Sequence, residues 1–193
     1  MCPIKTNLLS FGVFNVFIDD NRYPTKWENN GVVIVGGPVT IRTGANIGID
    51  HCGVLSFGGN VDIGHLTTIF AHKNITIGSR VSISWNVQLI DTDFHFMEEV
   101  STHSIMRKTA PITIGDECWI GNHSSIGKGV SLADGTTVAS YSVVTKSCLT
   151  PNSLLAGIPA TIKKSGSRRV FDKQREGQLE KEYWLSEFGQ TKY

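Results

Sequence analysis

The chain has 193 residues, 40% of them hydrophobic, and its 18 lysines and arginines against 17 aspartates and glutamates leave a net charge of +1. This length suits one domain with a sizeable core and is short for two. The balanced charge excludes a global field that would draw the protein to nucleic acid or to an anionic membrane surface. We therefore expect no nucleic-acid partner and no membrane insertion.

The cysteine pattern favours a reducing compartment. Cys2, Cys52, Cys118 and Cys148 lie far apart and form no C-x-x-C pair, which fits reduced, mostly buried thiols better than a disulfide framework or a zinc site. The apolar run at 8–18 has one lysine before it, two aspartates after it and no small-residue cleavage site, so it is not typical of a signal peptide. It is also too short to span a bilayer. We expect a cytoplasmic protein.

Residues 1–31 predict an N-terminal capping segment. They are aromatic and β-branched at first and rich in turn residues from Asp19 to Pro24. Such a pattern indicates a strand or hairpin that covers the open end of the element that follows.

Residues 32–164 carry an apolar residue at six-residue intervals. The clearest run consists of Ile114, Ile120, Ile126, Leu132, Val138 and Val144. A helix has a period of 3.6 and a flat strand a period of two, so this spacing predicts short strands and tight turns. Stacked coils of three such segments form a solenoid with a triangular cross-section. The apolar residue points inward at every face, and small residues four positions later let the chain turn the corner. Function is then expected on the edges and loops.

The repeat is interrupted once and then ends. Residues 91–111 hold charged, aromatic and histidine residues where a coil would have stood, and a long excursion from a regular scaffold is typically functional or disordered. Its aromatic content favours order. Residues 165–193 carry alternating charges and apolar residues at helical spacing, which predicts a short C-terminal helix closing the other end.

Three stretches, in this order, carry more information than the repeat alone. They are Asp91-Thr92-Asp93-Phe94-His95, then Ile114-Gly115-Asp116-Glu117-Cys118-Trp119-Ile120-Gly121-Asn122, then Ser142-Val143-Val144-Thr145-Lys146 followed by Ala156-Gly157-Ile158-Pro159-Ala160. Over about residues 32–164 the chain resembles the hexapeptide-repeat acyltransferases, closest to the branch of galactoside and maltose acetyltransferases and polysaccharide O-acetyltransferases. The resemblance implies a mainly β, single-domain, left-handed parallel β-helix with an inserted loop. It also implies a homotrimer that uses acetyl-CoA, with each active site between neighbouring protomers.

The resemblance assigns the catalytic base to His95. Acetyl transfer to a hydroxyl needs a base for the hydroxyl proton, and an imidazole titrates near working pH. Asp91 and Asp93 are close enough in sequence to orient the ring or stabilise the imidazolium, and either could do so. The alternative is a polar loop that folds on its own turns. No Cys or Ser stands beside His95 to form an acyl-enzyme, so we expect direct attack in a ternary complex.

A metal site is a third interpretation of this loop. Two carboxylates and an imidazole could bind a divalent ion, and a β-helix carbonic anhydrase has a related fold with interfacial histidine–zinc sites. His72, His95 and His103 do not look like that family's pattern. We expect no metal.

The motif around Asn122 resembles the part of the family's site that meets the thioester. A backbone N–H near Asn122 would donate to the oxyanion of the tetrahedral intermediate, while an ordinary turn amide is the alternative for its side chain. Trp119 has an outward place in its hexapeptide. The resemblance assigns it to the cofactor cleft, with a subunit interface as the competing interpretation.

The other cofactor contacts also follow from the resemblance. Ala139 and Ser140 stand where the family has small residues facing the pantetheine arm, with which backbone amides can pair. The residues expected near the nucleotide end, where lysines suit phosphates, are Thr145, Lys146, Lys163 and Lys164. The sequence departs from the sugar acetyltransferases at Ser140, where alanine is common, and at Thr161, where a basic residue often stands. A solvated basic stretch is the alternative for Lys163 and Lys164.

The acceptor pocket is assigned to His72, Trp85 and Asn86. They are expected to project from the two coils before the loop, and aromatic and amide groups suit a sugar. Surface residues between protomers are the alternative.

Together these patterns predict an acetyl-CoA-dependent O-acetyltransferase that acts on a saccharide hydroxyl in surface polysaccharide biosynthesis. A xenobiotic (antibiotic) acetyltransferase, which would share the cofactor half of the site, stays open. So does a non-catalytic trimeric β-helix scaffold. A serine acetyltransferase is disfavoured, because its members resemble a β-helix preceded by a long helical domain, for which the N-terminal segment is too short.

Overall fold

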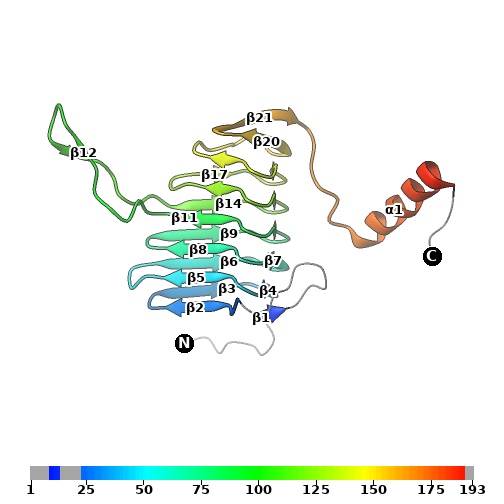
Figure 1. Cartoon of the computed structure of the whole chain (residues 1–193), viewed down its shortest axis with the longest axis horizontal. Coiled ribbons are helices and arrows are strands. Elements are labelled where there is room, and N and C mark those ends of the chain that lie inside the picture. The colour runs from blue at the N-terminus through cyan, green and yellow to red at the C-terminus, as the bar shows by residue number, and fades with distance from the viewer. Residues whose placement is uncertain (1–8, 14–22, 190–193) are drawn as a thin grey trace.

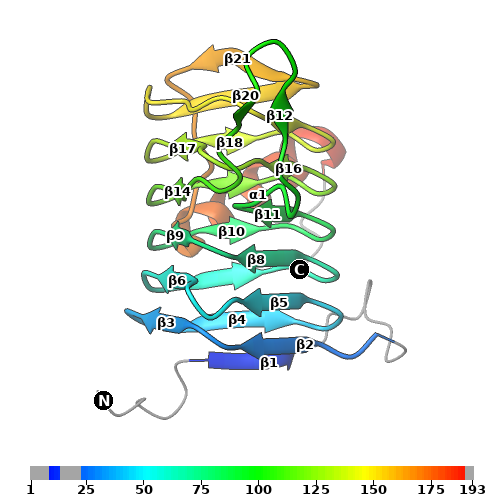
Figure 2. The same ribbon diagram turned by 90° about the vertical axis from the view of Figure 1, so that its left-hand side faces the viewer.

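The protein, seen in a computed structural model, is a triangular prism of stacked coils with two appendages (Figures 1 and 2). The structure describes residues 9–13 and 23–189. Three sheets form the faces of the prism, and each coil adds one strand to each sheet in turn. The predicted mainly β, parallel β-helix fold is confirmed. Within the described residues, no helix is long and apolar enough to cross a membrane.

The strands of each face pair in parallel, except for the last strand of the first face, which is antiparallel. The first face contains β1 (Leu9–Val13), β4 (Val39–Arg42), β7 (Val61–Ile63), β10 (Ser82–Ile83), β15 (Trp119–Ile120), β18 (Thr137–Val138), β20 (Ser153–Gly157) and the antiparallel β21 (Ala160–Ser165). The second face contains β2 (Lys26–Asn29), β5 (Asn46–Ile49), β8 (Thr68–Ala71), β11 (Gln88–Ile90), β16 (Ser125–Ile126) and β19 (Val143–Val144). The third face contains β3 (Val32–Val35), β6 (Val54–Phe57), β9 (Asn74–Ile77), β14 (Ile112–Ile114) and β17 (Ser131–Leu132).

The core is a set of aliphatic columns along the prism axis. On the first face the pairing register places Ile63, Ile83, Ile120, Val138 and Leu155 in one column, and all five are buried. The six residues of the clearest repeat are also buried. Because parallel pairing sets identical positions above one another, each inward residue packs on its equivalents in the coils above and below.

Small residues line the corners of the triangle, as predicted. The residues four positions after the inward ones are buried, and they are Ala45, Thr67, Val81, Val87, Cys118, Ser124, Thr136 and Ser142. The hydroxyls among them bond to turn carbonyls of the coils. Thr67 Oγ1 donates to Ser84 O at 2.9 Å and Ser124 Oγ to Ala139 O at 2.9 Å. These bonds satisfy polar groups that the tight turns would otherwise bury without partners.

The predicted start of the coils needs correction. β1 pairs in parallel with β4 and β2 with β5, so the coils begin before residue 32 and the segment 1–31 is not only a cap. The repeat is hidden there because Trp27 occupies an inward-packing position in place of an aliphatic residue. The rest of the predicted cap, residues 1–8 and 14–22, lies outside the described residues.

The C-terminal helix forms but does not close the prism. α1 (Lys173–Phe188) begins at Asp172, whose carboxylate accepts from Arg175 N at 2.9 Å, and ends at Gly189 in the left-handed region. Figure 1 shows α1 beside the prism, away from its last coil. β21 folds back on β20 and completes the first face instead.

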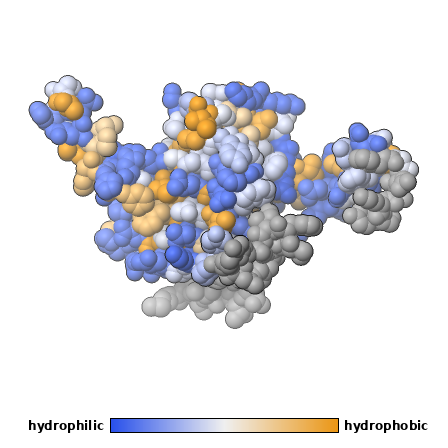
Figure 3. Space-filling model, in the orientation of Figure 1, coloured by the Kyte–Doolittle hydropathy of each residue, from blue (hydrophilic) through white to orange (hydrophobic). Residues whose placement is uncertain are grey.

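The predicted loop at 91–111 leaves the prism between the second and third faces. Its tip is an antiparallel hairpin of β12 (Glu98–Glu99) and β13 (Ser104–Ile105), which projects far from the coils (Figure 1). The hairpin region exposes large apolar side chains, namely Phe96, Met97, Val100, Ile105 and Met106. Figure 3 shows apolar surface along this projection.

Candidate active site

The assigned residues lie mainly on two edges of the prism, one at each end of the second face. We call the edge between the first and second faces the Asn122 edge; its turns lie at 64–66, 84–86, 121–123 and 139–141. We call the edge between the second and third faces the loop edge; it holds the turns at 50–53, 72–73, 127–129 and 145–147 and the loop 91–111. Each strand of the second face therefore separates the two edges.

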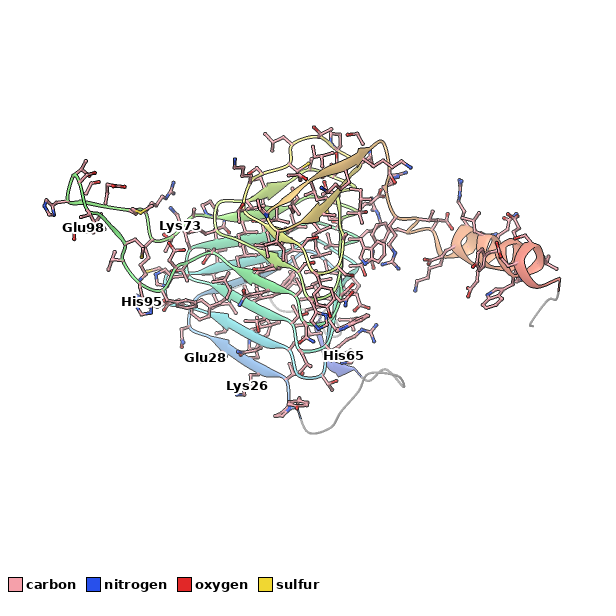
Figure 4. The ribbon with its side chains drawn as sticks, turned by 45° about the horizontal axis from the view of Figure 1, so that its top comes forward. Lys26, Glu28, His65, Lys73, His95 and Glu98 are labelled. Atoms are coloured by element: carbon pink, nitrogen blue, oxygen red, sulfur yellow. The ribbon has the colours of Figure 1, made fainter. Side chains whose placement is uncertain are left out.

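His95 lies at the base of the loop, on the same side of the prism as Lys73 (Figure 4). The chain turns sharply before it, because Phe94 has a φ of 59° and its N–H donates to Thr92 Oγ1 at 3.1 Å. The Phe94 ring packs on Phe70 of β8, with ring centroids 5.1 Å apart. The His95 side chain is exposed and has no partner in the part of the chain that the structure describes. Its imidazole is thus available to a ligand.

Asp91 is a structural residue of the loop base. Its carboxylate is fully buried and accepts three backbone hydrogen bonds, from His72 N at 2.8 Å, Lys73 N at 2.8 Å and Asn74 N at 2.7 Å. These bonds occupy both carboxylate oxygens. Asp91 therefore fastens the start of the loop to the turn below it and does not contact His95.

Asp93 also has a partner other than His95. Its carboxylate forms an ion pair with Lys128, and Lys128 Nζ donates to Arg107 O at 2.6 Å. This lysine links the outgoing and returning arms of the loop. Neither aspartate orients the His95 ring within one chain, so the predicted contact is not formed there.

A polar network covers the Asn122 edge. Ser140 Oγ donates to Asn122 Oδ1, and two amides flank the His123 ring, Asn122 Nδ2 at 2.9 Å from Nδ1 and Asn86 Nδ2 at 3.3 Å from Nε2. Tyr141 stacks on His123 with ring centroids 4.6 Å apart. The structure thus unites Asn86, Asn122 and Ser140, which the sequence had assigned to three different roles.

The backbone of the same edge offers free donors. The N–H groups of Gly121 and His123 donate to carbonyls at 2.7 and 3.2 Å. The N–H groups of Trp85, Asn122 and Ser140 have no partner among the residues described. They occupy one turn position in three successive coils, and such a row can bind an oxyanion or the carbonyls of an extended ligand.

Sequence reasoning missed His123 and Tyr141, although the repeat carries the signal. Each stands three residues after an inward residue, as Asn86 does. All three adopt left-handed φ values between 54° and 59°. Residues at this position share the outer side of the turn, so one assigned member predicts the others.

Trp119 lies on the first face, next to the Asn122 edge. The side chain is 38% exposed, and Nε1 lies 3.3 Å from Ser84 Oγ. The Arg169 guanidinium lies over the Trp119 ring at 5.4 Å and over the Phe171 ring at 5.0 Å, a cation–π arrangement. The segment that leads to α1 thus crosses the predicted cofactor residue, a contact that no sequence pattern indicated.

The other cofactor residues do not share one surface of a single chain. Ala139 is on the Asn122 edge, half-buried, and its N–H donates to Leu155 O at 2.8 Å. Thr145 and Lys146 are exposed on the loop edge. Lys163 and Lys164 are exposed on β21, in the last part of the prism. The set is divided because consecutive turns of one coil lie at different corners.

The predicted acceptor residues are divided in the same way. Trp85 and Asn86 lie on the Asn122 edge, but His72 lies on the loop edge, with Nδ1 2.6 Å from Asp50 Oδ2. His72 follows a strand of the second face, whereas Trp85 follows a strand of the first. One chain alone does not form the predicted pocket.

The three histidines of the metal interpretation are also separate. His72 pairs with Asp50, and His103 pairs with Glu98 at 2.8 Å on the hairpin, whereas His95 lies at the loop base. In the described ranges, 9–13 and 23–189, no group of three His, Cys, Asp or Glu side chains is arranged to hold a metal ion.

Comparison with known proteins agrees with this architecture. The family model described as bacterial transferase hexapeptide (six repeats) matches residues 111–146. Galactoside O-acetyltransferase of Escherichia coli K12 is 34% identical over 149 residues, which cover 74% of this chain and 71% of that protein. The putative lipopolysaccharide biosynthesis O-acetyl transferase WbbJ of the same strain is 28% identical over 149 residues, covering 73% and 76%.

A solved structure shares the fold. AntD, an N-acyltransferase from Bacillus cereus in complex with dTDP and 3-hydroxybutyryl-CoA, has a TM-score of 0.61 at 21% identity, and the match covers 84% of this chain and 84% of that one. With the identity to the galactoside enzyme over most of both chains, the prism and its interrupting loop establish that this chain belongs to the hexapeptide-repeat acyltransferases.

Proposed function

We propose that the protein transfers an acetyl group from acetyl-CoA to a saccharide hydroxyl, in surface polysaccharide biosynthesis. The observation that carries this proposal is the accessible imidazole of His95 at the base of the loop, in a chain 34% identical to a galactoside O-acetyltransferase. The lipopolysaccharide biosynthesis relative supports the polysaccharide context. The 3-hydroxybutyryl-CoA complex of AntD, which has a similar fold, supports an acyl-CoA donor.

The active site is formed between protomers of a homotrimer. His95 and Asn122 lie on opposite edges of one chain, so a base on the loop edge meets the Asn122 edge only of a neighbouring copy. Contacts between two different edges repeat around a three-fold axis and close into a ring. The exposed apolar side chains of the hairpin region support such an interface, because a surface of this kind is usually covered.

The residues of the Asn122 edge suit a coenzyme A thioester. The ring of Trp119 and the hydroxyl of Ser140 are accessible, and the free N–H groups of Trp85, Asn122 and Ser140 can pair with the carbonyls of a pantetheine arm. Thr145, Lys146, Lys163 and Lys164 stay proposals for the nucleotide end, where the ammonium groups suit phosphates. Bound acetyl-CoA would supply the thioester carbonyl that is attacked.

Different residues of the chain then carry out proton transfer, oxyanion stabilisation and positioning of the loop. His95 takes the proton of the acceptor hydroxyl as its oxygen bonds to the acyl carbon, and it returns that proton to the thiolate that leaves. The free N–H of Asn122 stabilises the oxyanion. Asp91 and Asp93 act through the loop: they hold its base and its two arms in place, so that the imidazole is preorganised.

Thiol release from acetyl-CoA with a panel of methyl glycosides tests the proposal. His95→Ala should lower kcat by about two to four orders of magnitude, as expected for loss of a general base, with the trimer intact by light scattering. His103→Ala is the matched control, since it removes an exposed imidazole from the same loop and should leave kcat unchanged. Equal rates for wild type and His95→Ala would refute the base assignment.

The same assay separates the alternatives. An antibiotic acceptor that is acetylated in preference to every glycoside would favour the xenobiotic enzyme. A stable trimer that acetylates no acceptor would favour the scaffold.

A further inference from the structure

One carboxylate on the loop edge lies within hydrogen-bond distance of two imidazoles. Asp50 Oδ1 lies 2.6 Å from His51 Nδ1, and Asp50 Oδ2 lies 2.6 Å from His72 Nδ1. The two histidines differ in their surroundings. The His51 side chain is 77% exposed, whereas that of His72 is 30% exposed. His72 therefore has a fixed place in the edge, while His51 lies out in solvent.

His72 is fastened to the base of the catalytic loop. The backbone N–H of His72 donates to the buried carboxylate of Asp91, which stands four residues before His95. Phe70, two residues before His72, packs on Phe94, the neighbour of His95. Figure 4 shows Lys73 and His95 on this same side of the prism. The imidazoles of His72 and His95 are thus carried by two segments that contact each other at two points.

Asp50 determines which nitrogen of His72 can meet a ligand. A carboxylate only accepts, so His72 Nδ1 must carry the proton that it donates, and the neutral ring keeps its lone pair at Nε2. Nε2 has no partner among the residues that the structure describes. Hydrogen bonds from the His51 backbone and then its side chain lower the pKa of Asp50 and keep the carboxylate anionic.

We propose that His72 and Asp50 form the acceptor-recognition subsite, a proposal that rests on the function proposed above. His72 Nε2 accepts a hydrogen bond from a hydroxyl of the saccharide other than the one that is acetylated, and Asp50 is the positioning residue that fixes the tautomer. Trp85 and Asn86, on the other edge of the same chain, belong to the part of the site that the neighbouring protomer contributes.

Steady-state kinetics with matched variants tests the assignment. Methyl glycosides of galactose, glucose, mannose and N-acetylglucosamine are screened with the wild type, and the best acceptor is used throughout. His72→Gln should raise the KM for that acceptor about tenfold, the usual effect of one lost hydrogen bond, with the KM for acetyl-CoA and the Tm unchanged. Asp50→Asn should change the acceptor KM in the same direction. His51→Gln, which removes the exposed partner of the same carboxylate, should change neither KM.

A second measurement begins with the wild type alone. Monodeoxy analogues of the best acceptor should include one, at a hydroxyl other than the acetylated one, whose kcat/KM with the wild type falls about tenfold. His72→Gln should no longer discriminate against that analogue. An unchanged acceptor KM in His72→Gln, or a deoxy series in which every non-reacting hydroxyl is dispensable, would overturn the inference.

The outcomes separate the two proposals. If His95→Ala abolishes turnover and His72→Gln leaves acceptor recognition unchanged, the subsite is wrong and the proposed function stands. If the wild type acetylates no glycoside of the panel, the proposed function fails and the subsite with it.

Discussion

The two edges of the second face arrange their functional groups in different ways. On the Asn122 edge the same short turn recurs in every coil, so Asn86, His123 and Tyr141 occupy equivalent positions set by the backbone. On the loop edge one turn is replaced by residues 91–111, and the position of His95 depends on a few contacts of Asp91, Asp93 and Phe94. On the first edge each of these three residues also donates its backbone N–H to a turn carbonyl of the neighbouring coil. The second can be loosened by single substitutions that leave the prism folded.

The largest expected effect comes from the core that supports the Asn122 edge. Ile120 is fully buried between Ile83 and Val138. Ile120→Ala should lower the free energy of unfolding by about 2–5 kcal/mol, because it removes buried methyl groups and leaves a cavity. Chemical denaturation measures this loss. The control is Thr113→Ala, an exposed strand position expected to change stability by less than about 0.5 kcal/mol; equal losses would contradict the columnar core.

A smaller loss of stability, with a large loss of activity, is expected at the loop base. Asp91→Asn replaces an acceptor-only carboxylate with an amide whose NH2 group meets backbone donors. One buried hydrogen bond to a charged group contributes about 1.5–3 kcal/mol, so the free energy of unfolding should fall by about that amount and kcat should fall with it. Denaturation and thiol-release assays on the same samples measure both.

Asp93→Asn is the comparison for that variant. It weakens a partly exposed ion pair with Lys128, which is worth about 0–1 kcal/mol. A loss of stability as large as that of Asp91→Asn would show that the loop, and not only its base, is part of the cooperative unit.

A moderate effect on the loop alone is expected from Phe94→Ala. The contact with the Phe70 ring contributes about 0.5–1.5 kcal/mol beyond its buried area. Its removal should speed amide hydrogen exchange in residues 92–110 and leave exchange in the second-face strands unchanged. Faster exchange in β8 and β11 would mean that the loop supports the face rather than the reverse.

The smallest effect concerns thiol reactivity and leaves the fold intact. Cys52 is exposed in a turn of the loop edge, whereas Cys118 lies inside a corner, where burial raises its pKa to about 12. The thiolate is the reactive form, so iodoacetamide at pH 8 should alkylate Cys52 and spare Cys118 in the native protein. Mass spectrometry of the Cys2→Ser variant reads out both sites, and guanidinium chloride should make them equal. Native labelling of Cys118 would indicate that the corner opens.

The sequence predicted the regular part of the molecule better than its irregular part. The period alone identified inward residues such as Ile114 on the third face and Ile120 on the first, because inward packing repeats at every face of every coil. It failed where Trp27 replaced an aliphatic residue, since an aromatic side chain there is not recognisable as part of the repeat. The interruption at 91–111 was visible as a break, but the hairpin within it had no periodic signal.

For the candidate site, the sequence could not reveal contacts between neighbouring coils, whose residues are far apart along the chain. The motif suggested His95, Asn122 and Ser140, and the exposure of His95 and Ser140 agrees with contact to a ligand. The roles of Asp91 and Asp50 depend on which turn lies beneath which, and no local pattern contains that information. The position of Arg169 over Trp119 depends on a segment that returns along the prism after the repeat has ended.

The stacking of turns on the Asn122 edge limits how such a site can change its reach. Neighbouring strands of a sheet are separated by about 4.8 Å, so Asn86 and Tyr141, two coils apart, are separated along the axis by about twice that spacing. A point substitution changes the side chain that one coil presents, but it does not change the spacing between coils. Accommodation of a longer or shorter ligand on this edge would therefore proceed by insertion or deletion of whole coils, in discrete increments.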